Sequence, residues 1–339
     1  MKTPEILAAL PSLSALVVGD ICLDRWCTYD PAMSEPSRET GIPRIGVVKT
    51  EATPGGGGTV ACNLAALGAS HVAVLGVTGD DGHGLELLRS LQACGISTEL
   101  MVTGAPTPTF TYTKLINAQT GVEDRPRVDF ISPRPILAEI ERRVLGRLES
   151  AAAGYDLVLV SDQAETEQGV ITPAMRLFLT NLAARYPRKI IWADSRKHVH
   201  EFRGVIVKPN REEADAACLR LFGEVDYQKL REYVETWLMV VTLGRDGALV
   251  VKPGRVTPVE TVPVEKPVDI CGAGDSFSAG AALALAVTGS AVEAVRFGNL
   301  VASITIMKKG TGAASLQEVL GGADDRSSSS ATERPRLDT

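Results

Sequence analysis

A glycine-rich turn that leads into an aspartate is the part of this 339-residue sequence best suited to chemistry. The segment DICGAGDSF occupies residues 269–277 and precedes an apolar helical run. Glycine lets the main chain approach an anion closely, and the first amides of a helix carry partial positive charge. We therefore predict that the charge of a transferring phosphoryl group is held by the backbone amides of Gly272, Ala273 and Gly274. Asp275, in the same first turn, would take the proton of the attacking hydroxyl.

Three other segments favour this interpretation over the alternative, in which the aspartate only caps a helix. Four glycines at residues 55–58 precede a helical pattern, which again permits close approach to a ligand, although a flexible hinge fits equally well. No Gly-Lys-Ser/Thr follows, so this is not a Walker loop. Asn210 and Glu213 begin another helix, where they could orient phosphate oxygens and magnesium-bound water, form a capping box, or do both. Thr242 to Gly244 fit a strand followed by a turn, a pattern of low specificity.

Short apolar runs alternate with helical patterns along the chain. The predicted strands are residues 15–19, 72–77, 157–161, 190–194, 205–208, 238–243 and 248–251. The predicted helices are residues 59–67, 84–94, 136–153, 172–185, 211–222 and 227–237. This alternation predicts an α/β fold with a doubly wound, mostly parallel sheet. Ligands of such folds bind at the carboxyl ends of strands, where this chain has Asp20, Asp162 and Asp194.

Two stretches interrupt the alternation. Residues 28–54 contain four prolines and no helical period, and residues 104–132 contain an alternating, β-rich run. Together they are predicted to form a small antiparallel β lid over the strand ends, which would exclude water during catalysis. Two irregular surface loops are the alternative. Residues 1–320 are predicted to form a single domain, and residues 321–339 a disordered tail because they lack apolar periodicity.

Composition narrows the possible partners. The net charge is -6 and the pI about 5.4, which disfavours nucleic acid or an anionic membrane as a partner. No apolar run is long enough to predict a membrane span. Six cysteines without a C-x-x-C pair suggest reduced thiols and a cytoplasmic protein. The pair His198 and His200 fits surface residues better than a metal site.

These motifs, in this order, resemble the ribokinase-like (PfkB-type) sugar kinase family over roughly residues 13–318. The resemblance implies that Asp275 is the catalytic base and that the chain uses ATP and Mg2+, with a requirement for K+ left open. It places the nucleotide phosphates and metal-bound water at Asn210, Glu213, Thr242 and Gly244, and the adenine at Asn299. It places the sugar at Asp24, Gly56, Gly57, Thr59, Asn63 and Arg127, with Thr59 standing where the family usually has asparagine. Homodimers formed through the lid are common in the family.

Several segments look most like heptose 7-phosphate kinases of that family, among them residues 17–25, 127–130 and 194–196. Those enzymes phosphorylate the anomeric O1 of a sugar that already carries a phosphate. Arginines in or beside the lid could pair with such a phosphate, or could be solvated surface residues; they are Arg25, Arg38, Arg44 and Arg127. The alternatives are another acceptor (a simple sugar, a sugar acid or a nucleoside) and a non-catalytic regulator that binds sugar or nucleotide. A nicotinamide-dependent dehydrogenase is disfavoured, because the turn after the first strand lacks G-x-G-x-x-G.

Overall fold

The computed structural model describes residues 1–104, 107–164 and 168–329, with side chains described up to residue 323. An eight-stranded sheet forms its centre, and all pairings from β12 to β4 are parallel, whereas β13 and β14 are antiparallel additions. The strands, in their order across the sheet, are β14 (Arg255–Val259), β13 (Ala248–Lys252), β12 (Met239–Thr242), β11 (Ile206–Val207), β10 (Ile190–Ser195), β9 (Leu157–Asp162), β1 (Ser14–Gly19) and β4 (His71–Leu75).

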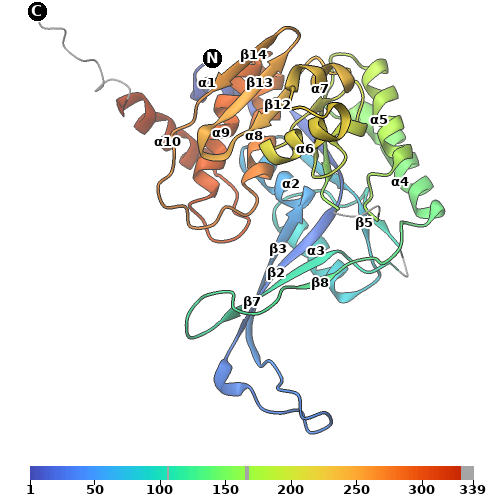
Figure 1. Ribbon diagram of the computed structural model, residues 1–339, viewed down its shortest axis with the longest axis vertical. Helices are drawn as coiled ribbons and strands as arrows, with labels where there is room; N and C mark the ends of the chain where they lie inside the picture. Colours follow the sequence, from blue (N-terminus) through green and yellow to red (C-terminus); the bar gives the residue numbers. More distant parts are fainter. Residues whose placement is uncertain (105–106, 165–167, 330–339) are drawn as a thin grey trace, which may run out of the picture.

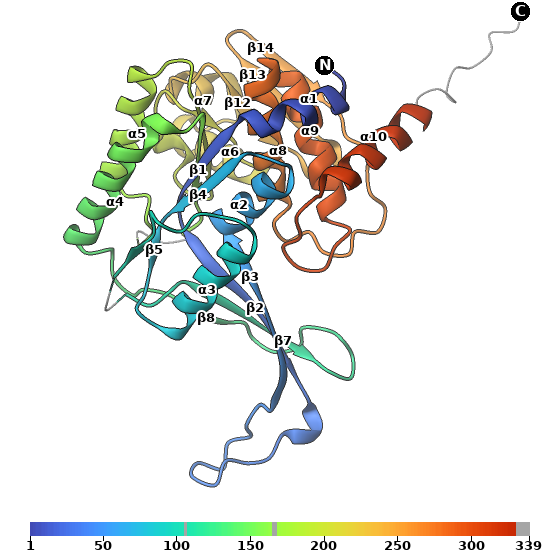
Figure 2. The same ribbon diagram turned by 180° about the vertical axis from the view of Figure 1, so that it is seen from behind.

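Helices cover both faces of this sheet (Figures 1 and 2). One face carries α1 (Thr3–Ala9), α2 (Gly57–Ala66), α8 (Ala273–Thr288) and α9 (Ala291–Thr305). The other carries α4 (Ala138–Ala151), α5 (Pro173–Arg185), α6 (Arg211–Phe222) and α7 (Tyr227–Tyr233). Side chains alternate along β1, so that Ala15 and Val17 join the first core and Leu16 and Val18 the second. Burial on both faces explains why these strands are continuous apolar runs.

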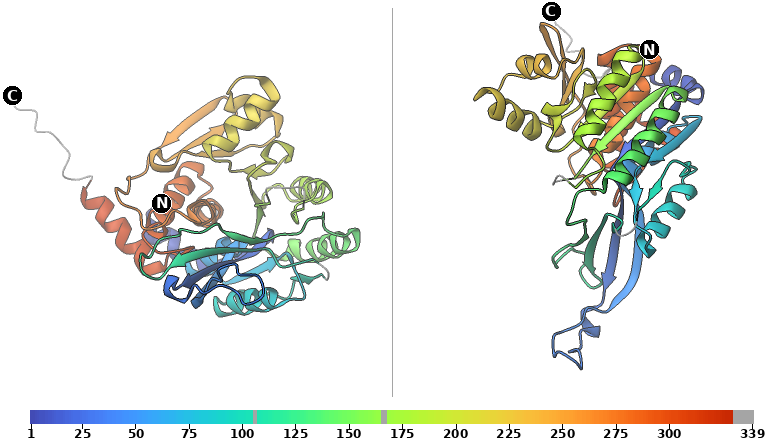
Figure 3. Two further views of the ribbon diagram at one scale, coloured as in Figure 1. Left: turned by 60° about the horizontal axis from the view of Figure 1, so that its bottom comes forward. Right: turned by 90° about the vertical axis from the view of Figure 1, so that its right-hand side faces the viewer.

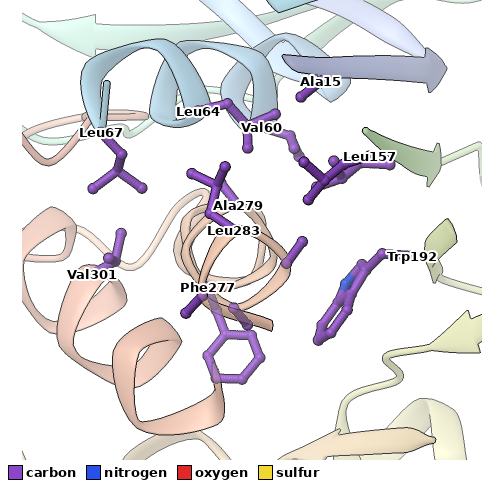
Figure 4. Close-up of a cluster of buried hydrophobic side chains, with 14 of the residues drawn as sticks. Ala15, Val60, Leu64, Leu67, Leu157, Trp192, Phe277, Ala279, Leu283 and Val301 are labelled. Carbon is purple, nitrogen blue, oxygen red and sulfur yellow. The ribbon is translucent and has the colours of Figure 1, made fainter. Parts of the chain in front are cut away.

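The helix that carries the glycine turn lies at the centre of the first core. Figure 4 shows α8 end-on, with Val60 and Leu64 of α2 on one side and Trp192 of β10 on another. Its residues 276–285 are all buried. Small side chains such as Ala279 let neighbouring helices approach closely, and a Cβ on Gly280 would lie 2.8 Å from Val301 of α9. The helix is therefore held rigidly, and so is the turn at its start.

A second, smaller sheet projects from one end of the core as a lid (Figure 3). Its strands, in order, are β3 (Val47–Gly56), β2 (Ile21–Tyr29), β7 (Thr111–Asn117) and β8 (Val128–Phe130). The outer pairings are antiparallel, but β2 and β7 run parallel. The two predicted stretches thus form a β lid, which begins earlier than predicted because β2 follows β1 directly. The helix α3 (Gly82–Ala93) packs against β2 and β3 at its base.

The predicted tail differs from the structure. Instead of disorder from residue 321, α10 (Leu316–Ser329) continues through this segment, while residues 330–339 lie outside the described residues. Val319 is fully buried, and a Cβ on Gly322 would lie 3.2 Å from Leu300 of α9. Packing of this short apolar face onto α9 thus extends the folded domain. Within the described ranges, no helix is long and apolar enough to cross a membrane.

Candidate active site

The first turn of α8 begins at a glycine that no other residue would replace easily. Gly272 has φ of +76°, and a Cβ there would lie 3.1 Å from a methyl carbon of Thr59. The Ser276 amide donates to the Gly272 carbonyl at 2.9 Å, which closes the first helical turn. The Ala273 amide donates to the Ile270 carbonyl at 3.2 Å, so this member of the predicted anion hole already has a partner within the turn.

Two cavities meet at this turn. The smaller, of about 100 Å³, lies under the lid, and the larger, of about 630 Å³, lies along the carboxyl ends of β10 to β12. Four residues line both: Gln163, Arg196, Gly272 and Asp275. Asp275 therefore stands where a group bound in one cavity meets a group bound in the other.

The Asp275 carboxyl is strongly affected by its surroundings. Burial raises its pKa to about 8, and the negative charge of Asp194 acts in the same direction. The positive charges of Lys208 and Arg196 oppose this rise. A carboxyl with a raised pKa at the junction of two cavities has the properties of a general base.

A buried ion pair lies beside Asp275. The Lys208 Nζ is 2.8 Å from Oδ2 of Asp194, and both residues are at least nine-tenths buried. Ser278 of α8 donates to the same carboxylate at 3.3 Å, which ties the pair to the helix. A Cβ on Gly274 would lie 3.5 Å from Lys208 Nζ, so the ammonium group lies next to the glycine turn. The turn thus combines helix amides with a fixed cation.

The polar end of the larger cavity is formed by the start of α6 and the end of β12. Asn210 and Glu213 form a capping box, because each side chain accepts a hydrogen bond from the other residue's amide, at 2.9 and 2.7 Å. Burial raises the pKa of Glu213 to about 7, with the charge of Asp194 adding to the rise. Thr242 and Gly244 line the same end. All four residues predicted to lie near the nucleotide phosphates therefore line the same cavity.

The far end of the larger cavity is apolar. Its walls include Val262, Pro263, Ile270, Ala302 and Ile306. Asn299 of α9 lies among them and donates to the Glu260 carbonyl at 3.5 Å. A long cavity with one polar and one apolar end suits a molecule with phosphates at one end and a planar base at the other.

The smaller cavity combines a carboxylate with several cations. Burial raises the pKa of Asp24, on β2, to about 6, and nearby Lys114, Arg127 and Arg196 oppose the rise. The positively charged residues that line this cavity are Arg25, Lys114, Arg127 and Arg196. Arg127 also forms a two-pronged pair with Asp129, with both distances 2.7 Å, and lies over the Tyr112 ring. The cavity can therefore accept a ligand that carries both hydroxyls and negative charge.

Comparison with known proteins decides the family. The sequence profile of the pfkB family of carbohydrate kinases matches residues 14–168 and 188–318. The chain belongs to this family. It is therefore an ATP-dependent carbohydrate kinase, and the glycine turn with the two cavities that meet at Asp275 is its candidate active site.

Similar proteins fall within the same family of folds. The kinase is 30% identical over 325 residues to the "Bifunctional protein HldE" of Pelobacter propionicus, and 31% identical over 324 residues to that of Chromohalobacter salexigens. These matches cover 93% and 92% of the kinase but only 64% of each relative. The fold matches phosphofructokinase-2 of Escherichia coli (TM-score 0.70, 20% identity, 93% and 99% of the two chains). It also matches ribokinase of Arabidopsis thaliana (TM-score 0.63, 17% identity, 92% and 98% of the two chains).

The glycine segment before α2 is placed differently from the prediction. Gly56, with φ of +55°, lines the smaller cavity as predicted. Gly57, Thr59 and Asn63 are buried and line neither cavity. Thr59 donates to the Pro54 carbonyl at 3.0 Å, and Asn63 connects α2 to residues 312 and 314. Thr59 packs behind the turn at Gly272. The geometry gives no support for direct contact between these three positions and a sugar.

Sequence reasoning assigned no role to Lys114, Arg196 or Lys208, although all three line the cavities. Lys114 lies on β7 opposite Trp26 of β2, a parallel pairing that no local pattern reveals. Arg196 follows β10 and donates to Gln163 at 2.8 Å. Two arginines predicted for the lid differ from each other: Arg25 lines the smaller cavity, whereas Arg44 pairs with Glu35 on an exposed part of the β2–β3 connection.

Proposed function

We propose that this kinase transfers the γ-phosphoryl group of ATP to the anomeric O1 of heptose 7-phosphate, with Asp275 as the base. The position of Asp275 on the wall shared by both cavities carries this proposal. Nucleotide phosphates would reach Asp275 from the larger cavity, and the acceptor hydroxyl from the smaller one. Such an arrangement lets one carboxylate remove the hydroxyl proton as the oxygen attacks phosphorus.

The glycine turn would hold the charge that develops during transfer. The Gly272 and Gly274 amides lie at the positive end of α8, and Lys208 adds a cation that Asp194 keeps in place. Fixed dipoles and charges in a buried site stabilise a transition state without reorganising at the moment of reaction. Lys208 and Arg196 also favour the ionised form of Asp275, which a base requires.

Magnesium fits the polar end of the larger cavity. Among the described residues, no three His, Cys, Asp or Glu side chains form a metal cage. Magnesium needs no such cage, because it is usually held by one or two carboxylates, water and substrate phosphates. Glu213, fixed by the capping box, would hold it through water, where the ion would neutralise phosphate charge.

We assign no residue to K+, and activity assays with K+ added or replaced by Na+ decide whether it is required.

The charge of the smaller cavity favours a phosphorylated acceptor. Its four cationic side chains outnumber its two carboxylates, Asp24 and Asp275. Hydroxyls of a neutral sugar need no such excess, whereas a second phosphate does. The Arg127 fork pairs with Asp129 in this structure, so a bound phosphate would share it or compete for it. The resemblance of residues 127–130 to heptose 7-phosphate kinases supports the same acceptor. The HldE-named relatives are consistent with it, although this chain spans only 64% of their length.

An acceptor screen tests the proposal. ADP release is measured with heptose 7-phosphate, the unphosphorylated heptose, fructose 6-phosphate, ribose and a nucleoside, with Asp275→Asn as the inactive reference. We expect kcat/KM to be highest for heptose 7-phosphate, and Asp275→Asn to lose about 10²–10⁴-fold in kcat.

Arg127→Ala should raise KM for the sugar phosphate by about tenfold or more, since a charge-assisted pair is lost, whereas Arg44→Ala serves as the matched surface control. Better turnover of an unphosphorylated acceptor would favour the second candidate, a kinase of the same mechanism for a neutral sugar or nucleoside.

We also propose a cytoplasmic homodimer formed through the lid. The two edge strands of the lid sheet, β3 and β8, carry exposed apolar side chains, among them Val47, Val48 and Val128. Unpaired strand edges with apolar side chains favour contact with another chain. A second subunit would cover them.

A further inference from the structure

Two cysteines outside both cavities lie in direct contact. The Cys62 Sγ is 3.2 Å from the Cys94 Sγ, although the residues are far apart in the sequence. Cys62 belongs to α2, and Cys94 is the C-cap of α3. Cys94 is exposed and Cys62 partly exposed, so a small molecule in solution can reach the pair. Neither residue lines the larger or the smaller cavity.

The contact is set by the packing of two helices. Val60 and Leu64 of α2 share a core with Leu87 and Leu91 of α3. A Cβ on Gly58 would lie 3.7 Å from the Leu91 side chain, so the two helices approach closely at this level. The thiols therefore do not depend on a loop to bring them together. Moving the two helix positions apart would require repacking of a buried core.

The two thiols differ in reactivity. The Cys62 thiol donates to the Cys94 sulfur, and this hydrogen bond lowers the pKa of Cys94 to about 7. Burial instead raises the pKa of Cys22, Cys218 and Cys271. Because the thiolate is the reactive form, Cys94 is the accessible nucleophile of the pair.

We propose that Cys62 and Cys94 are a reversible disulfide site, oxidised by a low-molecular-weight disulfide such as oxidised glutathione. The Cys94 thiolate attacks one glutathione sulfur, so that a mixed disulfide forms and one glutathione thiolate leaves. Cys62 then loses its proton to solvent and attacks the Cys94 sulfur, which releases the second glutathione thiolate. In sum, two protein thiols are oxidised to one disulfide and oxidised glutathione is reduced to two thiols.

The bond would join α2, which supports the glycine turn at Gly272, to α3, which supports the lid strands. Because the sulfurs already touch in the folded kinase, cross-linking should stabilise this arrangement rather than distort it. Closing the chain between residues 62 and 94 restricts mainly the unfolded state. The oxidised kinase should therefore unfold at a temperature several degrees higher and keep its nucleotide and sugar sites open.

Peptide mapping tests the site directly. Trypsin cleaves at Arg89, between the two cysteines, and yields peptides 50–89 and 90–114 with one cysteine each. After incubation of the full chain with oxidised glutathione at pH 7.5, non-reducing mass spectrometry should find these two peptides linked, and dithiothreitol should separate them. Cys94→Ser should abolish the linked peptide and the rise in Tm, while Cys218→Ala should keep both.

Other results would overturn the proposal. One is a Cys94 that stops at the glutathione mixed disulfide or stays fully reduced in folded wild type. Another is a linkage that appears only between two molecules, seen as a covalent dimer on a non-reducing gel. The Cys62→Ser variant distinguishes these steps, because it should accumulate the Cys94 mixed disulfide. If Cys62→Ser instead leaves Cys94 unmodified, Cys94 is not the attacking thiol.

Discussion

Single carboxyl groups decide most of the chemistry, and Asp275 illustrates how burial and charge set its behaviour. Its pKa is raised to about 8 by desolvation and by Asp194. A base acts only when ionised, so a raised pKa confines activity to higher pH. Lys208 and Arg196 keep the rise from being larger. If Asp275 is the base, as proposed, this environment strengthens it as a base but leaves less of it ionised at neutral pH.

We predict that kcat/KM for the sugar rises with pH, with a midpoint near pH 8, and levels off at higher pH. The slope reports the Asp275 carboxyl of the free enzyme, which loses its proton in this range. Lys208→Met removes a positive charge that lowers the pKa of Asp275, so the rising limb of the pH profile should move to higher pH. Steady-state rates between pH 6 and 9.5 measure this, with Lys197→Met, an exposed neighbour of β10, as the control. An identical limb in Lys208→Met would contradict the assignment of this limb to Asp275.

At the scale of elements, the start of α6 is both a helix cap and a part of the larger cavity's wall, and the proposed nucleotide role can be separated from capping. Asn210 and Glu213 satisfy the helix amides and also face the larger cavity. Asp226 caps α7 in a similar way, accepting from the Gln228 and Lys229 amides, but lies outside that cavity. The comparison of the two caps distinguishes a purely structural role from one that also serves the nucleotide.

We predict that Asn210→Ala and Asp226→Ala both lower the free energy of unfolding by about 1 kcal/mol, the usual cost of a lost cap. Only Asn210→Ala should raise KM for ATP, because it also frees Glu213 from its fixed position. Urea unfolding and ATP titrations of the rate measure the two effects. Equal KM values in both variants would mean that the capping box serves stability alone.

The sequence alone was sufficient to predict the strands and helices whose hydrophobic pattern is local. Strands β1 and β9 are continuous apolar runs because both of their faces are buried. The lid was harder to predict, because β2 includes the charged residues Asp24 and Arg25 and pairs with β7, which is distant in the sequence. Helix α9 was missed, although Ser290 caps it. The start of α10 was not predicted because its packing depends on α9, against which Gly322 lies, rather than on an apolar period of its own.

The candidate site follows the same division. Asp275, Asn210 and Thr242 carry motifs whose spacing reveals their position, and they meet at the larger cavity. Lys114 and Arg196 depend on strand order and on tertiary placement, which spacing does not encode. Thr59 shows the opposite case. It follows the glycine segment predicted to bind the sugar, yet its side chain is buried and donates to the Pro54 carbonyl.

At the scale of the whole molecule, the lid both closes the smaller cavity and exposes apolar edges. Its sheet ends in β3 on one side and β8 on the other, and neither edge is paired within the described residues. Val48 on β3 is 54% exposed and Val128 on β8 is 45% exposed. Burying such edges in a dimer would also steady the strands that carry Asp24 and Lys114, so assembly and activity should be linked.

We predict that the wild-type chain is a dimer of the 35.9 kDa subunit and that Val48→Asp combined with Val128→Asp yields monomers. A buried charge at an apolar contact is costly unless it is paired. Light scattering after size exclusion measures the mass, and Leu177→Asp, at an exposed position of α5, is the control because it lies outside the lid. The monomeric variant should also show a higher KM for the sugar, since the lid strands lose their support. A wild type that stays monomeric at micromolar concentration would contradict the proposed contact, and an unchanged KM in the monomer would break the link between assembly and the sugar site.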